Sequence, residues 1–225
     1  MSLTIIGGNV SPFVRKVRVA LMEKGLDYTH EQINPFSPPA GWREISPLGR
    51  IPAFKDGDRV INDSSVICQY LERRFPKPSL YPADDADFAR ALWLEEYVDG
   101  GIVPVIGPKF FLALVLRPLI SQKPADEAAE AEAKRTWEQD APQYFDYLEK
   151  TLGDEEYFVG GRLSIADISV ASPFINLRHA GYLPERKRWP RLRAFLDRMW
   201  KRPSFQKALD EESPVFGKRA ANIKD

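Results

Sequence analysis

The sequence predicts a small α/β domain followed by an all-helical domain. Strand and helix patterns alternate over the first eighty residues, a segment with three prolines in ten residues follows at 76–85, and strand patterns largely disappear beyond it. A length of 225 residues accommodates two domains with sizeable cores. We therefore expect a first domain at 1–77, a linker at 78–87 and an all-helical domain at 88–225.

The first domain is predicted to begin with a strand at 3–6 (LTII) and a helix at 11–24. Ser11 is a suitable N-cap, because its hydroxyl can accept a hydrogen bond from a free N–H of the first turn. Pro12 fits the first helical position, where its missing N–H costs nothing. The apolar residues that follow recur on one helical face.

The rest of the first domain is predicted to add three strands and a helix. Residues 26–33 predict a second strand, and 36–49 are irregular. The segment 51–61 predicts two short strands around the turn at Asp56-Gly57, and 63–75 predicts a helix. A parallel unit followed by an antiparallel hairpin gives a four-stranded α/β domain.

Helical patterns continue through the second half of the chain. Ser164 and Asp167 have the spacing of a capping box, which marks a helix start. Gly153 is a suitable helix stop. The predicted helical segments are 87–99, 123–153, 163–181 and 190–212.

Composition excludes several classes of function. Lys plus Arg and Asp plus Glu both number 32, so the net charge of zero argues against a dedicated nucleic-acid binder. The single cysteine, Cys68, excludes an internal disulfide and suits a reducing compartment. No signal peptide is visible, and the apolar stretch 100–116 contains two prolines and a lysine, which makes it a poor membrane span. We expect a cytoplasmic protein.

Metal and hydrolase chemistry find little support in the sequence. The two histidines, His30 and His179, lack ligand spacing, so we expect no metal site. No nucleophile-elbow motif surrounds Ser11, and no dinucleotide or Walker loop is present. Cys68 lies mid-helix beside apolar neighbours, so we expect a buried structural thiol.

Three stretches of the first domain carry candidate chemistry, each with a purely structural alternative. SPF at 11–13 opens a helix, and GRIPAF at 49–54 opens a strand at its proline. NDSS at 62–65 precedes a helix that Asp63 or Ser64 can cap.

Together, these stretches resemble the cytosolic glutathione transferases. SPFVRKVRVALMEKG resembles the first helix of the serine-type enzymes, notably the plant tau class and many bacterial relatives. RIPAF resembles the segment that carries the family's cis-proline. DSSVICQYLERRF resembles the family's motif of an acidic residue followed by serine, together with its third helix. GGRLSIADISVA resembles the helix-capping segment of its second domain. The resemblance extends from residue 3 to about residue 205. It implies a thioredoxin-like first domain, an all-helical second domain, glutathione as co-substrate and a homodimer.

The resemblance also implies roles for individual residues. Ser11 matches the catalytic serine, whose hydroxyl donates a hydrogen bond to the glutathione thiolate. Ile51 matches the residue whose backbone pairs with the cysteinyl backbone, next to the cis-proline Pro52. Asp63 matches the residue that binds the ammonium group of the γ-glutamyl end. Ser64, at a helix N-terminus, matches the residue that binds the carboxylate of the same end.

Further glutathione contacts are expected around this set. Arg50 stands where tau-like enzymes often have lysine, and its guanidinium can bind the glycyl carboxylate bidentately. Phe13 is placed in the same site, and Trp42 and Arg43 are further candidate ligands. Asp63 is shorter than the glutamate of many relatives, so its reach to the ammonium is shorter.

The function expected from the resemblance is conjugation of glutathione to a small hydrophobic electrophile. The electrophile is expected near Phe110 and Phe111 of the second domain, whose alternative role is in the helical core. A glutathione-dependent isomerase or dehalogenase remains an alternative, as does a non-catalytic binding or interaction protein with the same fold. A thiol-transferase is disfavoured, because that chemistry requires cysteine where Ser11 stands.

Overall fold

The computed structural model describes residues 2–220, with side chains described to residue 212. Residue 1 and residues 221–225, which the predicted domain ranges include, lie outside the described residues. Segments labelled η are π-helical. In chain order the elements are β1 (Leu3–Ile6), α1 (Pro12–Glu23), β2 (Thr29–Glu31), α2 (Trp42–Ile45), β3 (Ala53–Asp56), β4 (Arg59–Asn62), α3 (Ser64–Arg74), α4 (Asp85–Glu96), η1 (Tyr97–Ile102), α5 (Val103–Ile106), η2 (Gly107–Leu116), α6 (Arg117–Ser121), α7 (Glu127–Arg135), η3 (Thr136–Asp140), α8 (Pro142–Leu152), α9 (Ile165–His179), α10 (Pro190–Met199) and α11 (Pro203–Ala220).

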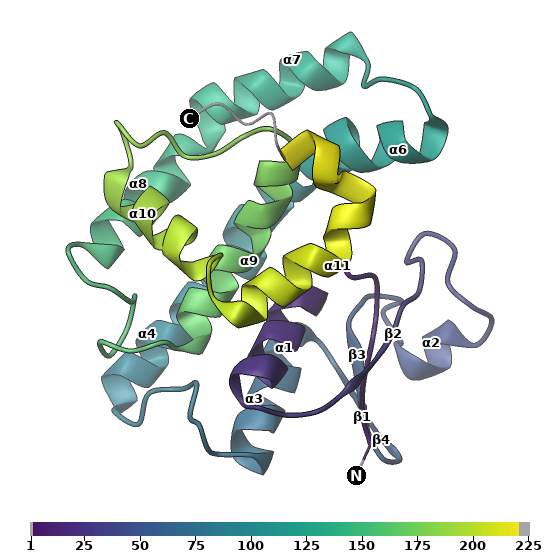
Figure 1. The fold of residues 1–225 in the computed structure, drawn as a ribbon, viewed down its shortest axis with the longest axis vertical. Coiled ribbons are helices and arrows are strands. Elements are labelled where there is room, and N and C mark those ends of the chain that lie inside the picture. Colours follow the sequence, from purple (N-terminus) through teal and green to yellow (C-terminus); the bar gives the residue numbers. More distant parts are fainter. Residues whose placement is uncertain (1, 221–225) are drawn as a thin grey trace.

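The sheet of the first domain has the strand order β2-β1-β3-β4. β1 is parallel to β2 and antiparallel to β3, and β3 and β4 form an antiparallel hairpin, which confirms the predicted topology. Successive side chains point to opposite faces. Ile5 and Phe54 therefore join the core under α1 and α3, while Ile6 and Ala53 pack against Trp42 of α2. Figure 1 shows α1 and α3 on one side of the sheet and α2 on the other.

Helix α9 forms the centre of the second domain (Figure 1). Nearly all of its residues are buried, and it packs against α1 and α4. Ser164 and Asp167 form the predicted capping box, in which both the Ser164 N–H and its hydroxyl donate to Asp167. A buried helix that starts with its own satisfied cap therefore provides a rigid wall against the first domain.

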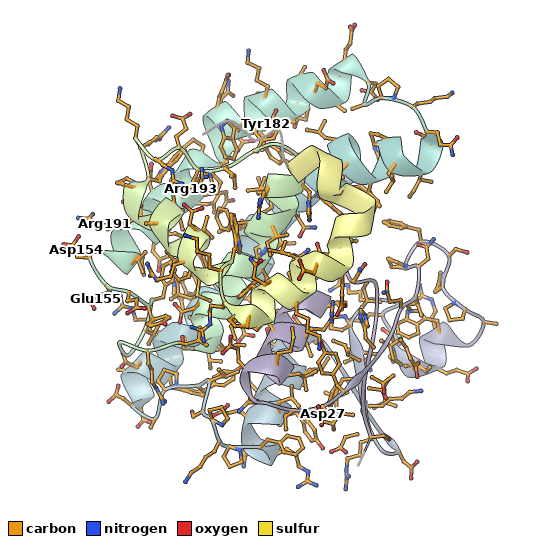
Figure 2. All side chains as sticks on the ribbon, in the orientation of Figure 1. Asp27, Asp154, Glu155, Tyr182, Arg191 and Arg193 are labelled. Atoms are coloured by element: carbon orange, nitrogen blue, oxygen red, sulfur yellow. The ribbon has the colours of Figure 1, made fainter. Side chains whose placement is uncertain are left out.

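The helical domain has an aromatic interior and a charged exterior. Phe110 is fully buried and packs edge-on against Tyr182, with ring centroids 4.8 Å apart. Arg191 and Asp154 form an exposed ion pair of 2.8 Å at the edge of this domain (Figure 2). Tyr182, also labelled in Figure 2, is partly buried and packs its ring against the core.

The segment Asp85–Ser121 is one continuous helical run, despite the prolines within it. Its π-helical turns flank Val103-Pro104 and include Pro108, where a missing N–H interrupts the α-helical bonding. The run is long and apolar enough, with a window of mean hydropathy 1.7, to cross a membrane by length and composition alone. Ile102, Ile106 and Phe110 of this run are buried in the core, whereas Leu119 and Ile120 are exposed.

Buried basic residues of α1 connect the two domains. Lys16 is 1% exposed and donates to Glu95 at 3.0 Å and Asp99 at 2.5 Å. Burial lowers the pKa of Lys16, but the two carboxylates outweigh it and the net effect raises this pKa. Arg15 and Arg18 are equally buried and both pair with carboxylates of α11. The first helix is therefore docked through charges that the sequence pattern did not reveal.

Candidate functional site

Ser11 lies in the loop between β1 and α1 and caps α1, as predicted. Its backbone is extended, with φ −70° and ψ 128°, and Pro12 is the first residue of the helix. Ser11 Oγ accepts a hydrogen bond from the Val14 N–H at 3.4 Å, which is longer than the usual range of about 2.7–3.2 Å. Because the oxygen is the acceptor in this bond, the O–H hydrogen remains available to a ligand.

The second predicted stretch forms an extended edge opposite Ser11. The Ile51–Pro52 peptide bond is cis, and β3 begins directly after it at Ala53. Ser46 Oγ donates to the Arg50 carbonyl at 2.7 Å and holds this segment from behind. Among the described residues, none hydrogen-bonds the backbone N–H or C=O of Ile51, so both groups can pair with an extended peptide.

The third predicted stretch caps α3. Asp63 has a positive φ of 74°, which is uncommon for a non-glycine residue and is typical of strained functional positions. Its Oδ1 accepts from the N–H groups of Ser65 at 2.9 Å and Val66 at 3.2 Å. Ser64, the first residue of α3, is buried, and its hydroxyl makes no hydrogen bond within the described part of the chain. The second oxygen of Asp63 and the Ser64 hydroxyl are thus available to a ligand.

These residues come together in one cavity of about 330 Å³. Six of the residues predicted to bind glutathione line it, whereas Ser11, Trp42 and Arg43 do not. Its lining residues are Phe13, Ser46, Pro47, Leu48, Arg50, Ile51, Pro52, Asn62, Asp63 and Ser64. Backbone groups of an extended segment, a carboxylate, a helix N-terminus and a guanidinium therefore surround the same space.

Ser11 lines a neighbouring and larger cavity of about 610 Å³, which shares Phe13 and Ile51 with the first. Its wall combines the β1–α1 loop, segment 32–36, helices α5 to α6 and helix α9. No Lys, Arg, His, Asp or Glu is found among the described residues that line it. Ser11 therefore lies in the apolar cavity, close to the two residues that both cavities share.

The structure corrects part of the expected electrophile pocket. Phe111 lines the apolar cavity, but Phe110 points into the aromatic core, so the expectation for Phe110 is wrong. Consecutive residues of a helix point in different directions, and here Phe111 faces the cavity while Phe110 faces the core. Trp42 and Arg43 line a different cavity, where Arg43 donates to the Pro47 carbonyl at 3.1 Å.

Several cavity residues were not predicted. Asn9, Val10, Pro173 and Asn176 line the apolar cavity, and the last two come from α9. Asn176 is one of several polar residues in the helical segment 163–181, so the sequence alone did not single it out. Its Nδ2 donates to the Val10 carbonyl at 3.0 Å, next to Ser11.

Cys68 is buried in α3, as expected for a structural thiol. Burial is the largest influence on its pKa and raises it strongly, despite the nearby Lys16 charge. A thiol held in its neutral form is a poor nucleophile. In the described part of the chain, no group of three or more His, Cys, Asp or Glu side chains is arranged to hold a metal ion.

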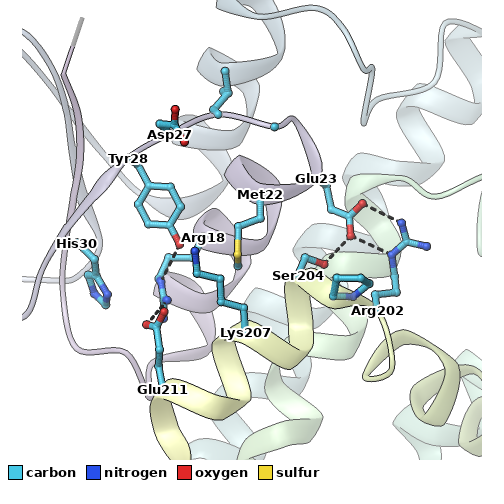
Figure 3. Close-up of a pocket in the computed structure, with 13 residues that line it drawn as sticks. Arg18, Met22, Glu23, Asp27, Tyr28, His30, Arg202, Ser204, Lys207 and Glu211 are labelled. Carbon is cyan, nitrogen blue, oxygen red and sulfur yellow. Dashed lines mark hydrogen bonds and ion pairs between the residues drawn. The ribbon is translucent and has the colours of Figure 1, made fainter.

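Another cavity, of about 720 Å³, lies on the other side of α1 against α11 (Figure 3). Two of its three acids are paired with arginines: Glu23 binds Arg202, and Glu211 binds Arg18, while Asp27 is exposed. Opposite charges are mixed along its wall, so it has no single-sign field for a charged ligand. The predicted catalytic and glutathione-binding residues line the cavities of about 610 and 330 Å³ and not this one.

Comparison with known proteins identifies the family. The family model "Glutathione S-transferase, N-terminal domain" matches residues 6–79, and "Glutathione S-transferase, C-terminal domain" matches residues 115–212. Glutathione S-transferase Z2 of Arabidopsis thaliana is 31% identical over 210 residues, covering 91% of this chain and 89% of the relative. The chain belongs to the glutathione S-transferase family. This transferase is also 28% identical to the maleylacetoacetate isomerase of Pseudomonas aeruginosa over 205 residues, covering 88% and 92% of the two chains.

Comparison with solved structures supports the same family assignment. A glutathione S-transferase from Rhodospirillum rubrum F11 superposes with a TM-score of 0.84 and 25% identity, covering 97% and 98% of the two chains. One from Methylobacterium radiotolerans, in complex with glutathione sulfonate, has a TM-score of 0.74 and 28% identity and covers 92% and 94%. The thioredoxin-like plus helical fold and glutathione as the family's co-substrate are thus confirmed. The chain is an enzyme of the glutathione transferase or isomerase type.

Proposed function

We propose that the enzyme transfers the thiol of glutathione to a neutral, hydrophobic electrophile and that Ser11 stabilises the attacking thiolate. One observation carries this proposal: Ser11 lies in the apolar cavity, close to Phe13 and Ile51, which line both this cavity and the first one. A thiol bound in the first cavity and an electrophile in the second would meet beside the Ser11 hydroxyl.

The first cavity offers a complementary group for each part of glutathione. The Ile51 backbone would pair with the cysteinyl backbone, and the free oxygen of Asp63 would bind the γ-glutamyl ammonium. The Ser64 hydroxyl and N–H would bind the adjacent carboxylate at the α3 N-terminus. Arg50 would bind the glycyl carboxylate, which suits a guanidinium.

The role proposed for Ser11 is sufficient to ionise the thiol. Lowering a thiol pKa from about 8.5 to about 6.5 requires about 2.7 kcal/mol of preference for the thiolate. A hydrogen bond to a charged acceptor contributes about 1.5–3 kcal/mol, and the N-terminus of α1 adds about 0.3–1 kcal/mol. The hydroxyl donates here and accepts no proton, so the thiol proton leaves to solvent.

The lining of the apolar cavity favours conjugation over isomerisation of a carboxylate. Maleylacetoacetate, named as the substrate of one relative, carries negative charge. Burying a carboxylate without a cationic partner is costly, and no cation lines the described part of this cavity. A neutral aryl halide, epoxide or enal meets no such penalty.

A matched substrate pair tests this proposal. Turnover is measured with a neutral aryl halide and with the same aryl halide bearing a carboxylate, at saturating glutathione. We expect kcat/KM to favour the neutral substrate by at least about tenfold, or 1.4 kcal/mol. Equal values, or faster isomerisation of a carboxylate substrate, would contradict the proposed substrate class. Failure to bind immobilised glutathione would instead favour a non-catalytic binding protein.

We also propose a cytoplasmic homodimer, which is the commonest symmetric assembly. Leu48, Val66 and Trp93 are large apolar side chains that stay at least half exposed in the single chain. Their burial in a second copy would remove apolar surface from water.

A further inference from the structure

A buried guanidinium connects the loop that carries Ser11 to the C-terminal helix. Arg15 lies one helical turn after Ser11, and its N–H donates to the Ser11 carbonyl at 2.9 Å. Its side chain is fully buried and binds Glu212 of α11 bidentately, with Nε–Oε1 and Nη2–Oε2 distances of 2.7 Å. Nη1 donates to the Ser172 carbonyl at 2.7 Å and to Asn176 Oδ1 at 2.8 Å, both on α9. Helices α1, α9 and α11 therefore meet at one side chain.

The same cluster holds the backbone immediately before Ser11. The Val10 carbonyl accepts from Asn176 Nδ2 at 3.0 Å and from Arg15 Nη2 at 3.4 Å. Asn9 Nδ2 donates to the Glu211 carbonyl of α11 at 3.1 Å. Both residues before Ser11 are thus held by side-chain hydrogen bonds to the second domain.

Ser11 itself is held weakly by its own side chain. The only hydrogen bond that its hydroxyl makes to a described residue is the 3.4 Å bond to Val14. The direction of the hydroxyl therefore depends on the backbone of the Asn9–Ser11 loop, and that backbone depends on Arg15, Asn176 and α11.

We infer that Arg15 and Glu212 are positioning residues that aim the Ser11 hydroxyl at the glutathione thiolate. This inference rests on the proposed role of Ser11 and adds a requirement for the C-terminal helix. Glu212 fixes the orientation of the Arg15 guanidinium, which in turn fixes Val10 both directly and through Asn176. Neither residue lines either cavity, so both act through the loop and touch no substrate.

Burial of the pair does not by itself explain its presence. Replacing a buried ion pair by apolar residues of similar size is often neutral or stabilising. Positioning does explain it, because a displacement of about 1 Å at a reacting group can cost on the order of 10²-fold in rate. Arg15 and Glu212 are 197 positions apart, so the pair exists only in the folded two-domain chain.

A second ion pair, between α1 and the residue just before α11, provides a matched control. Glu23, the last residue of α1, binds Arg202 bidentately at 2.9 and 2.8 Å, at the end of α1 away from Ser11 (Figure 3). Glu23→Gln and Glu212→Gln each remove one charge from a bridge between α1 and the segment that begins α11. Only the Arg15–Glu212 bridge contacts the loop that carries Ser11.

The test is a spectrophotometric titration of the thiolate of bound glutathione in the full chain. We expect Glu212→Gln to raise the thiol pKa by about half a unit to one unit, less than Ser11→Ala, because the hydroxyl is displaced and not removed. The KM for glutathione should change by less than about twofold, since the peptide is held elsewhere. Glu23→Gln should leave the thiol pKa unchanged.

A second variant guards against loss of folding. Arg15→Met combined with Glu212→Leu removes both charges of the ion pair and leaves His179, whose Nε2 lies 3.1 Å from Glu212 Oε2, as the remaining polar neighbour. This variant should fold yet still show a raised thiol pKa. A wild-type thiol pKa in a folded Glu212→Gln or double variant would overturn the inference, as would an equal rise in Glu23→Gln. If Ser11→Ala shifts the thiol pKa while these variants do not, the inference fails alone. If Ser11→Ala also has no effect, the proposed role of Ser11 fails with it.

Discussion

Replacing Ser11 by alanine separates its two roles, because the capping role affects the free energy of unfolding and the proposed catalytic role affects the pKa of the glutathione thiol. The capping bond is 3.4 Å long, so its contribution falls at the lower end of the usual 0.5–2 kcal/mol, at about 0.5 kcal/mol of unfolding free energy. The hydrogen bond to a thiolate is charge-assisted and contributes about 1.5–3 kcal/mol, or about one to two pKa units. The structure therefore predicts a small loss of stability and a large change in thiol ionisation.

The assay is the thiolate titration of bound glutathione, together with turnover at pH 6.5. If the thiol pKa rises from about 6.5 to between about 7.5 and 8.5, the ionised fraction at pH 6.5 falls by about five- to fifty-fold. Turnover should fall by the same factor, provided that thiolate attack limits the rate. Glutathione affinity should change less, because its ends are bound in the first cavity.

Asp126→Ala is the matched control for Ser11→Ala. Asp126 caps α7, where its Oδ1 accepts from the Ala129 N–H at 2.7 Å, and it lines neither cavity. It should cost more stability than Ser11→Ala, about 1 kcal/mol, and leave the thiol titration unchanged. Identical titration curves for wild type and Ser11→Ala would refute the reasoning. The activating group would then be sought in Asn9 or in a tyrosine of the second domain.

Four further predictions follow from the site and the fold. Ser64→Ala should weaken glutathione binding by roughly 1–3 kcal/mol, measured by calorimetry, and an unchanged Kd would remove Ser64 from the site. Leu112→Lys places a cation in the apolar cavity and should raise kcat/KM for a carboxylate-bearing electrophile, relative to the neutral electrophile, about three- to tenfold. Leu119→Lys, on the exposed surface, should leave this ratio unchanged. Equal effects of the two variants would argue against the cavity as the electrophile site. Light scattering at micromolar concentration should give about twice the 25.6 kDa of one chain, and a monomer mass would contradict the dimer. Burial raises the pKa of Glu212, but the Arg15 charge and the hydrogen bonds from His179 and Arg15 outweigh burial, so the net effect lowers this pKa. The ionised Glu212 therefore stabilises the fold above its unfolded pKa, and this stabilisation is lost as the pH falls through the folded pKa. Tm should drop less between pH 7 and pH 3 in Glu212→Gln than in wild type, and an equal drop would count against this linkage.

The sequence determined the features that depend on near neighbours along the chain. The Ser11 cap, the Asp56-Gly57 hairpin and the Ser164–Asp167 capping box were predicted and are confirmed. Each depends on backbone sterics or on hydrogen bonds between residues two to four positions apart. Such interactions are encoded in short patterns and need no knowledge of packing. The cis bond before Pro52 came from the family resemblance, since sequence alone does not fix it.

Tertiary structure decided which side chains face one another. Phe110 and Phe111 are equivalent in sequence pattern, yet only Phe111 reaches the cavity, because the packing of the continuous run from α4 to α6 sets its rotation. The apolar pattern of α1 likewise gave no sign that Arg15 is buried against Glu212. A carboxylate 197 positions away compensates for the cost of burying that charge. Only the folded chain brings the two together, so no local pattern could have shown it.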